Sequence, residues 1–257
     1  MKVFTYVISL ADQIDRRGHI AKQLAALNLP FVFHDACDFR NLDVTEIDNY
    51  IEVDKLYGRP QRRLTRGEVG CALSHITLLN KIKTADSYSS DSNILVLEDD
   101  AKLEPELIGF LNSDELNKFD WDVIILGYSK LKNQDRKSFF IKEPIKKIHT
   151  INGVSIGRVW KEWTCGTVGY LVNGKSINKF SLLKVSTVAD DWDFLQKKLD
   201  LNILHCRPLL IEESFLEFSS AIEPERKTYV EHGSKFFDFI RCCRGICRRL
   251  VMNFKHR

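Results

Sequence analysis

Three adjacent acids, Glu98, Asp99 and Asp100, directly follow the apolar run of residues 94–97. A short β-branched run with polar flanks predicts a buried strand, and ligands of open α/β sheets gather where strands end. Adjacent carboxylates repel one another unless a cation lies between them, and Mg²⁺ or Mn²⁺ takes oxygen ligands that include substrate phosphates. The triplet therefore predicts a metal that holds a nucleotide diphosphate. The alternative is a solvated turn that opens a helix, because acids suit a helix N-terminus.

A second set of polar residues follows Thr65, whose spacing to Glu68 is that of a capping box opening a helix to about residue 82. Glu68, Cys71 and His75 fall on one stripe of this helix, with Ser74 beside them and an apolar face opposite. Such a stripe could line a nucleotide pocket. The alternative is that Glu68 only caps the helix and His75 makes one structural hydrogen bond.

A third set is the acidic cluster Asp190, Asp191 and Asp193, interrupted by Trp192, at the start of a predicted helix. One of these acids could cap the helix, and the others could interact favourably with its dipole. In the functional interpretation, an Asp acts as the general base that accepts a proton from a hydroxyl group.

Several familiar catalytic motifs are missing from the sequence. No G-x-G-x-x-G follows the first predicted strand and no phosphate-binding G-x-x-x-x-G-K-[ST] is present, so the usual dinucleotide fold is not supported. A serine hydrolase is disfavoured because there is no G-x-S-x-G. Zinc is disfavoured because there is neither an H-E-x-x-H nor a paired Cys/His cluster.

The bulk composition is that of a globular protein, with 257 residues, 44% apolar and 28% charged. No stretch reaches the roughly 18 uncharged apolar residues that span a bilayer. The first ten residues are better interpreted as a strand than as a signal peptide. Seven cysteines without paired spacing favour a reducing cytosol over a disulfide framework.

The C-terminal segment 235–257 differs from the rest because it carries seven Lys or Arg and one Asp. Its apolar residues recur at steps of three and four, and Arg241, Arg244 and Arg248 fall on a different stripe. This pattern predicts a basic amphipathic helix that lies on an anionic membrane surface. The alternatives are a core-packing helix with a solvated Arg face and, less favoured, a nucleic-acid contact.

Elsewhere the pattern alternates strands and helices. Strands are predicted at residues 3–8, 31–33, 94–97, 122–126, 164–172 and 203–210, and helices at 16–27, 65–82, 176–183 and 190–199. Pro208 places the last strand at a sheet edge. Residues 128–150 lack apolar rhythm and are rich in Lys, which predicts an irregular loop, either functional or merely solvated. The alternation predicts an α/β fold with a largely parallel sheet.

In order and spacing, residues 3–222 resemble glycosyltransferase family 25, the group of bacterial lipooligosaccharide galactosyltransferases and related enzymes. The resemblance begins with Val7-Ile8-Ser9-Leu10 and Arg16-Arg17, and continues through segments 67–75, 97–100, 166–171 and 219–222. It implies a GT-A-like fold, with a mixed, mainly parallel sheet flanked by helices over residues 1–234. The segment 235–257 would then be a separate basic amphipathic tail.

By position, the resemblance also implies roles for single residues. Asp100 and Asp99 would bind Mn²⁺ or Mg²⁺, and Asp190 or Asp191 would be the base, although the family more commonly has a single Asp there. The residues near the nucleotide would be Ser9, Arg17, Ser74, His75, Glu98 and Asp99.

The implied function is inverting transfer of a hexose, most often galactose from UDP-galactose, to a lipooligosaccharide core acceptor. The Lys-rich segment 130–147 would suit phosphorylated, anionic lipid acceptors. The enzyme would lie in the cytoplasm on the inner face of the bacterial inner membrane, without nucleic acid as a partner. The alternatives are another metal-dependent nucleotide-sugar enzyme, such as a nucleotidyltransferase or phosphohydrolase, and a non-catalytic membrane-associated scaffold.

Overall fold

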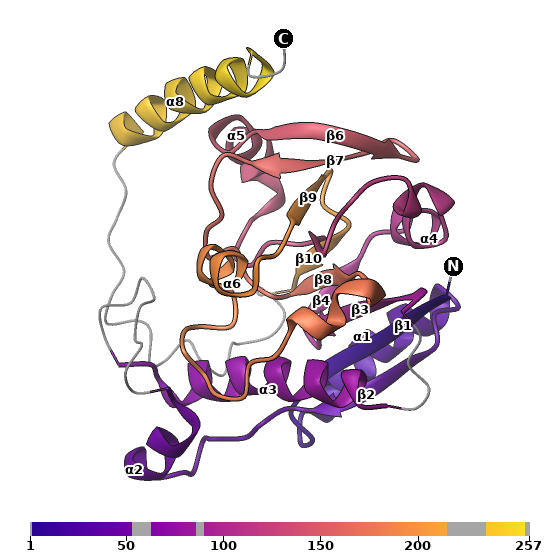
Figure 1. The fold of residues 1–257 in the computed structure, drawn as a ribbon, viewed down its shortest axis with the longest axis vertical. Helices are drawn as coiled ribbons and strands as arrows, with labels where there is room; N and C mark the ends of the chain where they lie inside the picture. The colour runs from indigo at the N-terminus through magenta and orange to yellow at the C-terminus, as the bar shows by residue number, and fades with distance from the viewer. Residues whose placement is uncertain (1, 53–62, 86–89, 215–234, 255–257) are drawn as a thin grey trace.

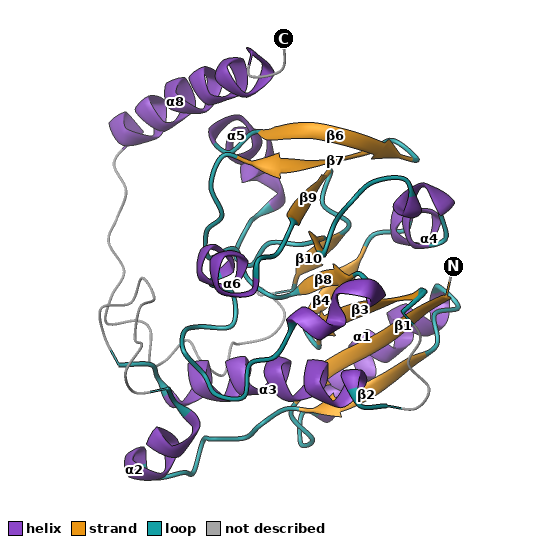
Figure 2. Ribbon diagram, in the orientation of Figure 1, coloured by secondary structure: helices purple, strands orange, loops and turns teal. Residues whose placement is uncertain are grey.

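An eight-stranded sheet forms the centre of the computed structural model, which describes residues 2–52, 63–85, 90–214 and 235–254. Its strand order is β2-β1-β3-β8-β5-β9-β7-β6 (Figures 1 and 2). The strands are β1 (Lys2–Ser9), β2 (Phe31–Asp35), β3 (Ser92–Glu98), β5 (Val123–Ile125), β6 (Ile145–Ile151), β7 (Val154–Val159), β8 (Gly169–Val172) and β9 (Ile203–Arg207). A two-stranded sheet pairs β4 (Ala101–Leu103) with β10 (Ile211–Glu213).

The direction of the strands changes across the sheet. Parallel pairs join β2 to β1, β1 to β3, and β5 to β9. The pairs β3–β8, β8–β5, β9–β7 and β7–β6 are antiparallel. The predicted mixed α/β class is therefore confirmed. The sheet was expected to be mainly parallel, but antiparallel pairs are at least as frequent. The reason is that β8 and the β6–β7 hairpin bring in antiparallel neighbours.

Two long helices, α1 (Ile14–Ala26) and α3 (Arg66–Lys83), pack beside the first three strands. Ile20 and Leu24 of α1 and Leu78 and Ile82 of α3 are buried in the main core. The shorter helices are α2 (Val44–Ile47), α4 (Glu106–Leu111), α5 (Arg136–Lys142) and α6 (Trp192–Leu199). Single 3₁₀ turns cover Asp48–Tyr50, Asp114–Asn117, Asn133–Asp135 and Gly174–Lys179.

The prediction of an irregular loop at residues 128–150 is wrong for most of that segment. It contains α5 and the strand β6, which pairs with β7 in a hairpin. Apolar rhythm is weak there because β6 is an edge strand, and Ile148 remains 42% exposed. A half-solvated edge strand has no need of a continuous apolar face.

The predicted edge position of residues 203–210 is also wrong. Strand β9 lies between β5 and β7, and the edges are β2 and β6. β9 ends at Arg207, so Pro208 removes no hydrogen bond from the ladder.

Two other predicted elements are shorter than expected. The strand predicted at 164–172 is regular only over Gly169–Val172, and the helix predicted at 176–183 is a 3₁₀ turn over Gly174–Lys179. The motif at 219–222 lies outside the described residues. No helix in the described part of the chain is both long and apolar enough to cross a bilayer.

The predicted C-terminal helix is present as α8 (Lys235–Phe254), and it packs against α5. The two helices approach closely at Gly245, where an added Cβ would lie 2.1 Å from the carbonyl oxygen of Ile141. Arg248 donates a 2.9 Å hydrogen bond to Glu143, and Met252 is buried. The side of α8 that faces the protein body therefore carries Gly, Met and Arg.

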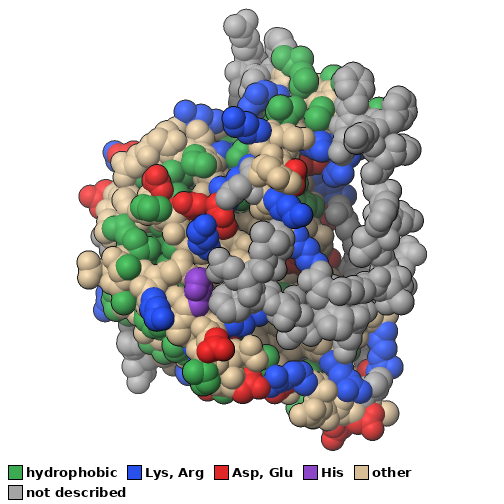
Figure 3. All heavy atoms as spheres, turned by 180° about the vertical axis from the view of Figure 1, so that it is seen from behind, with side chains coloured by type: hydrophobic (Ala, Val, Ile, Leu, Met, Phe, Trp, Pro, Cys, Tyr) green, Lys and Arg blue, Asp and Glu red, His purple; other side chains and the backbone are tan. Residues whose placement is uncertain are grey.

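Most described apolar side chains of α8 point away from the body. Ile240, Ile246, Leu250 and Val251 are between 42% and 53% exposed. Figure 3 shows hydrophobic side chains at the top of the molecule, where Figure 1 places α8, with Lys and Arg side chains below them. The exposed apolar side chains do not fit a helix that packs its apolar face into the core.

The close approach at Gly245 gives a prediction. Gly245→Ala should displace α8 from α5, because the new methyl group would overlap the Ile141 carbonyl. Hydrogen exchange should then become faster at the backbone amides of α5. The matched control is Gly18→Ala in α1, where a Cβ meets no atom within 4 Å. That change should stabilise the protein by up to about 1 kcal/mol through helix propensity. Equal stabilisation by both changes would contradict the packing described.

Candidate active site

A cleft of about 260 Å³ opens where β1 and β3 end, beside the N-terminal half of α3. Because β1 and β3 are parallel, Ser9 and Glu98 come to the same edge of the sheet. The cleft is closed by segments distant in sequence that include Lys130, Gly166 and Asp190. Among the residues predicted for the site, those that line it are Ser9, Ser74, Glu98, Asp99, Asp100 and Asp190.

The acidic triplet leads from β3 into β4. It therefore does not open a helix, which was the alternative to a metal site. Asp99 and Asp100 are only 6% and 9% exposed. The guanidinium of Arg16 lies against both carboxylates, with Nε 2.7 Å from Asp99 Oδ1 and one terminal nitrogen 2.8 Å from Asp100 Oδ2. A protein cation thus compensates part of the negative charge.

Arg16 lines the cleft, although the sequence analysis assigns only its neighbour Arg17 to the nucleotide. Arg17 does not line the cleft. It donates a 2.9 Å hydrogen bond to the Ser9 carbonyl and forms an ion pair with Asp35. The available signal was the position of both arginines in the first turn of α1, directly after β1.

The negative charge of the triplet is only partly compensated. Burial raises the pKa of Asp100 to about 8, the charge of Glu98 adds to the effect, and Arg16 opposes it. Burial also raises the pKa of Asp99. Among the described residues, Asp100 Oδ1 is buried without a hydrogen-bond partner. Both Asp99 oxygens are engaged, Oδ2 by the Ser9 hydroxyl at 2.6 Å and Oδ1 by Arg16.

These observations test whether the site suits a divalent metal. An orphaned carboxylate oxygen in an anionic, buried cluster is what Mn²⁺ or Mg²⁺ requires, and the donors are all oxygens. The residues therefore fit such an ion, with Asp100 offering a donor atom that has no partner among the described residues and Asp99 lying beside it.

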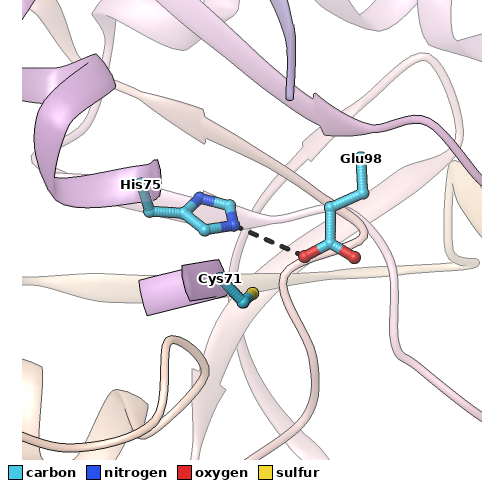
Figure 4. Close-up of side chains that lie close together, drawn as sticks. All are labelled: Cys71, His75 and Glu98. Carbon is cyan, nitrogen blue, oxygen red and sulfur yellow. Dashed lines mark hydrogen bonds and ion pairs between the residues drawn. The ribbon is translucent and has the colours of Figure 1, made fainter. Parts of the chain in front are cut away.

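Glu98 belongs to a different group of donors (Figure 4). Its side chain faces Cys71 and His75 of α3, and one ligand atom from each of the three lies within 4.8 Å of the others. His75 Nε2 is 3.4 Å from Glu98 Oε1, and Thr167 also hydrogen-bonds this carboxylate. Burial alone would raise the pKa of Glu98, but His75 and Thr167 outweigh it, so the pKa is lowered. Sulfur and imidazole donors suit softer metals than Mn²⁺.

The polar stripe of α3 has both structural and cleft-facing members. Glu68 and Thr65 form the predicted capping box, with hydrogen bonds of 2.9 and 3.2 Å. The hydroxyl of Ser74 donates to the Gly70 carbonyl at 2.6 Å and accepts from the Cys37 amide at 2.8 Å. Ser74 thus supports the cleft wall.

His75 is held from behind, because its Nδ1 lies 2.9 Å from the hydroxyl of Tyr170. This contact fixes the ring orientation, and leaves Nε2 directed towards Glu98. His75 itself does not line the cleft, but it contacts Glu98, which does.

The two candidate bases have different positions. Asp191 is the N-cap of α6, accepting hydrogen bonds from the Phe194 amide at 3.2 Å and the Thr187 hydroxyl at 2.8 Å. It is 3% exposed and does not line the cleft. Asp190 does line the cleft, and its Oδ2 accepts a 2.9 Å hydrogen bond from the Gly166 amide.

The model of Glycosyltransferase family 25 (LPS biosynthesis protein) matches residues 2–192. Lipooligosaccharide biosynthesis protein lic2B from Haemophilus influenzae is 31% identical over 68% of this chain and 61% of its own length. Procollagen galactosyltransferase 1-B from Xenopus laevis is 29% identical over 68% of this chain and 27% of its own.

The chain thus spans about a quarter of the procollagen relatives that it matches and under two thirds of the Haemophilus protein. A human relative, 34% identical over 48% of this chain, is named as an inactive member of the family. A solved Drosophila galactosyltransferase 7 mutant in complex with manganese, UDP-Gal and xylobiose covers 93% of this chain, with 10% identity and a TM-score of 0.39. That score marks a distant resemblance, so the assignment rests on the sequence matches. They place this chain in glycosyltransferase family 25.

Proposed function

We propose that this protein transfers galactose from UDP-galactose to a lipooligosaccharide acceptor, with inversion at the anomeric carbon. The names of the bacterial and procollagen relatives supply the sugar and the acceptor class. The observation that carries the proposal is a single cleft that contains both Asp100, with its orphaned oxygen, and Asp190. A cation-binding carboxylate and a general base in one cleft are the two parts that such a transfer needs.

The donor diphosphate would lie at the ends of β1 and β3. Asp100 and Asp99 would hold Mn²⁺ or Mg²⁺, and the bound ion would supply positive charge for the diphosphate leaving group. Ser9 and Arg16 keep Asp99 oriented, and Arg17 supports Ser9 from behind. Ser74, His75 and Glu98 complete the wall on the α3 side. In this proposal Arg17, Ser74 and His75 act on the nucleotide by positioning cleft residues.

Asp190 is the proposed base. As the acceptor oxygen attacks the anomeric carbon, its proton passes to the Asp190 carboxylate, and the bond from that carbon to the diphosphate oxygen breaks. One displacement inverts the centre without a covalent carboxylate intermediate. The hydrogen bond from the Gly166 amide holds Asp190 Oδ2 in place for this role.

We also propose that residues 235–257 hold the enzyme on the inner face of the bacterial inner membrane. The exposed apolar side chains of α8 lie beside the exposed Arg249, a combination suited to an anionic lipid surface.

The competing functions are separated by product analysis with labelled UDP-galactose. A phosphohydrolase releases galactose 1-phosphate without an acceptor, and a nucleotidyltransferase releases it only when pyrophosphate is supplied, with UTP as the second product. A scaffold, which the inactive human relative makes worth testing, binds UDP without turnover.

The first prediction from the proposed function concerns the base. Asp190→Asn should lower kcat by about 10²–10⁴ and leave the KM for UDP-galactose nearly unchanged, because only proton transfer is lost. The matched control is Asp191→Asn, which keeps a side-chain oxygen that can cap α6 and should therefore have little effect on stability and a much smaller effect on kcat. Steady-state kinetics and thermal melts measure both. A larger loss of kcat in Asp191→Asn would contradict the assignment.

The second prediction concerns Asp100 and pH. The pKa of Asp100 is raised in the folded state, to about 8 from 3.8, so the folded protein keeps a proton that the unfolded chain releases. This group therefore makes the metal-free protein progressively less stable as pH rises from about 4 to about 8. Asp100→Asn does not titrate, and its Tm should exceed that of the wild type by a margin that widens over this range.

The same variant tests the metal. Mn²⁺ with UDP should raise the Tm of the wild type and have no effect on Asp100→Asn, because ligand stabilises only a protein that binds it. The control is Asp114→Asn at an exposed acid remote from the cleft, which should behave as the wild type in both experiments. A wild-type Mn²⁺ response retained by Asp100→Asn would remove this carboxylate from the metal site.

The third prediction concerns the membrane. Replacing Ile246 and Leu250 together by Asp should lower the partition of the protein onto phosphatidylglycerol vesicles about tenfold or more, because apolar burial is lost and negative charge is added. Leu183→Asp changes a side chain that is 80% exposed and outside α8, and should leave sedimentation with vesicles unchanged. If the wild type, the double variant and Leu183→Asp sediment equally with vesicles, the apolar face of α8 does not bind lipid.

A further inference from the structure

A second cavity, of about 470 Å³, lies between α8, α5 and segments 128–131 and 161–165. We call it the arginine pocket. Its cationic lining residues are Lys130, Lys161, Arg241, Arg244 and Arg248. Three of these side chains, Arg241, Arg244 and Arg248, come from α8. Residues of both α8 and α5 line the pocket, and these two helices pack against each other.

The negative groups in this pocket already have partners. The two acids that line it are Glu143 and Glu162. Glu143 forms a 2.9 Å ion pair with Arg248, and Glu162 lies 2.8 Å from His205 Nε2. Among the described residues, neither Arg241 nor Arg244 has an acidic partner, and both are exposed. The pocket therefore carries net positive charge that an anionic ligand would balance.

The arginine pocket adjoins the candidate active site. Ser129 and Lys130 line both cavities. The Ser129 amide donates a 2.8 Å hydrogen bond to the Cys165 carbonyl, and the next residue, Gly166, holds Asp190 through its own amide. Gly166 has φ +90°, and an added Cβ there would collide with Ser129. A thin wall thus separates the proposed base from the arginines.

From this geometry we infer that the arginine pocket binds a phosphate group carried by the acceptor saccharide, so that the acceptor class is a phosphorylated glycan. This inference rests on the proposed function. Guanidinium groups bind phosphate through paired, charge-assisted hydrogen bonds. Trp163 and Phe139 supply an apolar wall beside the charge, as in many ligand pockets. A glycan anchored here reaches the cleft at Ser129 and Lys130, where its hydroxyl meets Asp190.

Phosphate on a membrane lipid has the same chemistry. The position of the arginine pocket, however, favours a phosphate on the acceptor saccharide over one on a lipid. The apolar face of α8 that would enter a membrane contains Ile246 and Leu250, with Arg249 exposed beside them and outside the pocket. Arg241 and Arg244 instead line a cavity that shares Ser129 and Lys130 with the cleft.

The test uses the double variant Arg241→Gln/Arg244→Gln and the control Arg249→Gln, which removes a charge from the same helix outside the pocket. The probes are core oligosaccharide released from lipooligosaccharide with its phosphate, and the same material dephosphorylated. For the phosphorylated probe, both the calorimetric Kd and the KM of transfer should rise about tenfold or more in the double variant. The KM for UDP-galactose should not change in either variant.

Specificity and salt dependence complete the expected result. The wild type should bind the dephosphorylated probe as weakly as the double variant does, and Arg249→Gln should match the wild type on both probes. The preference for the phosphorylated probe should shrink as salt rises, because the interaction is electrostatic.

Three outcomes would overturn the inference. The first is equal affinity of the wild type for the two probes. The second is equal affinity of the wild type and the double variant for the phosphorylated probe. The third is that Arg249→Gln weakens binding of the phosphorylated probe as much as the double variant does and also loses vesicle binding, which would make the arginines a lipid contact. Failure of the proposed function gives a different result: no transfer by the wild type to either probe. The calorimetric comparison would still decide the inference in that case.

Discussion

The proposed site depends on how the charge of three adjacent carboxylates is balanced where β3 ends. Arg16 supplies one positive charge to Asp99 and Asp100, and His75 interacts with Glu98 on the other side. The balance is incomplete, because Asp100 keeps a buried oxygen without a described partner and a raised pKa. A folded protein tolerates such a cost mainly where function requires it.

The architecture around this point serves to hold the charged groups in place. The parallel register of β1 with β3 aligns Ser9 with the triplet, and the turn into α1 brings Arg16 back over it. Helix α3 brings His75 to Glu98, and the capping box at Thr65 and Glu68 determines where that helix starts. Pairing of β10 with β4 places Glu213 beside Ala101, and its charge further disfavours ionisation of Asp100.

Much of this arrangement could be predicted from local sequence. The strands at 3–8 and 94–97 and the helix after Thr65 have strong periodicity or a capping signal, and all three are confirmed. The choice between Asp190 and Asp191 could not be predicted, because both are adjacent acids at a helix start and only tertiary structure shows which one caps it. Arg16 was missed for a similar reason: consecutive residues of a helix point in different directions, and sequence alone does not show which one faces the strand ends. The hairpin of β6 and β7 and the central position of β9 depend on non-local pairing, for which local propensity gives little signal.

The most direct test of the account is an anomalous difference map at the manganese absorption edge, from crystals grown with MnCl₂ and UDP. The account predicts a peak bound to the Asp100 carboxylate, with the UDP diphosphate as a further ligand. A cleft without manganese at Asp100, or manganese only between Cys71, His75 and Glu98, would contradict it.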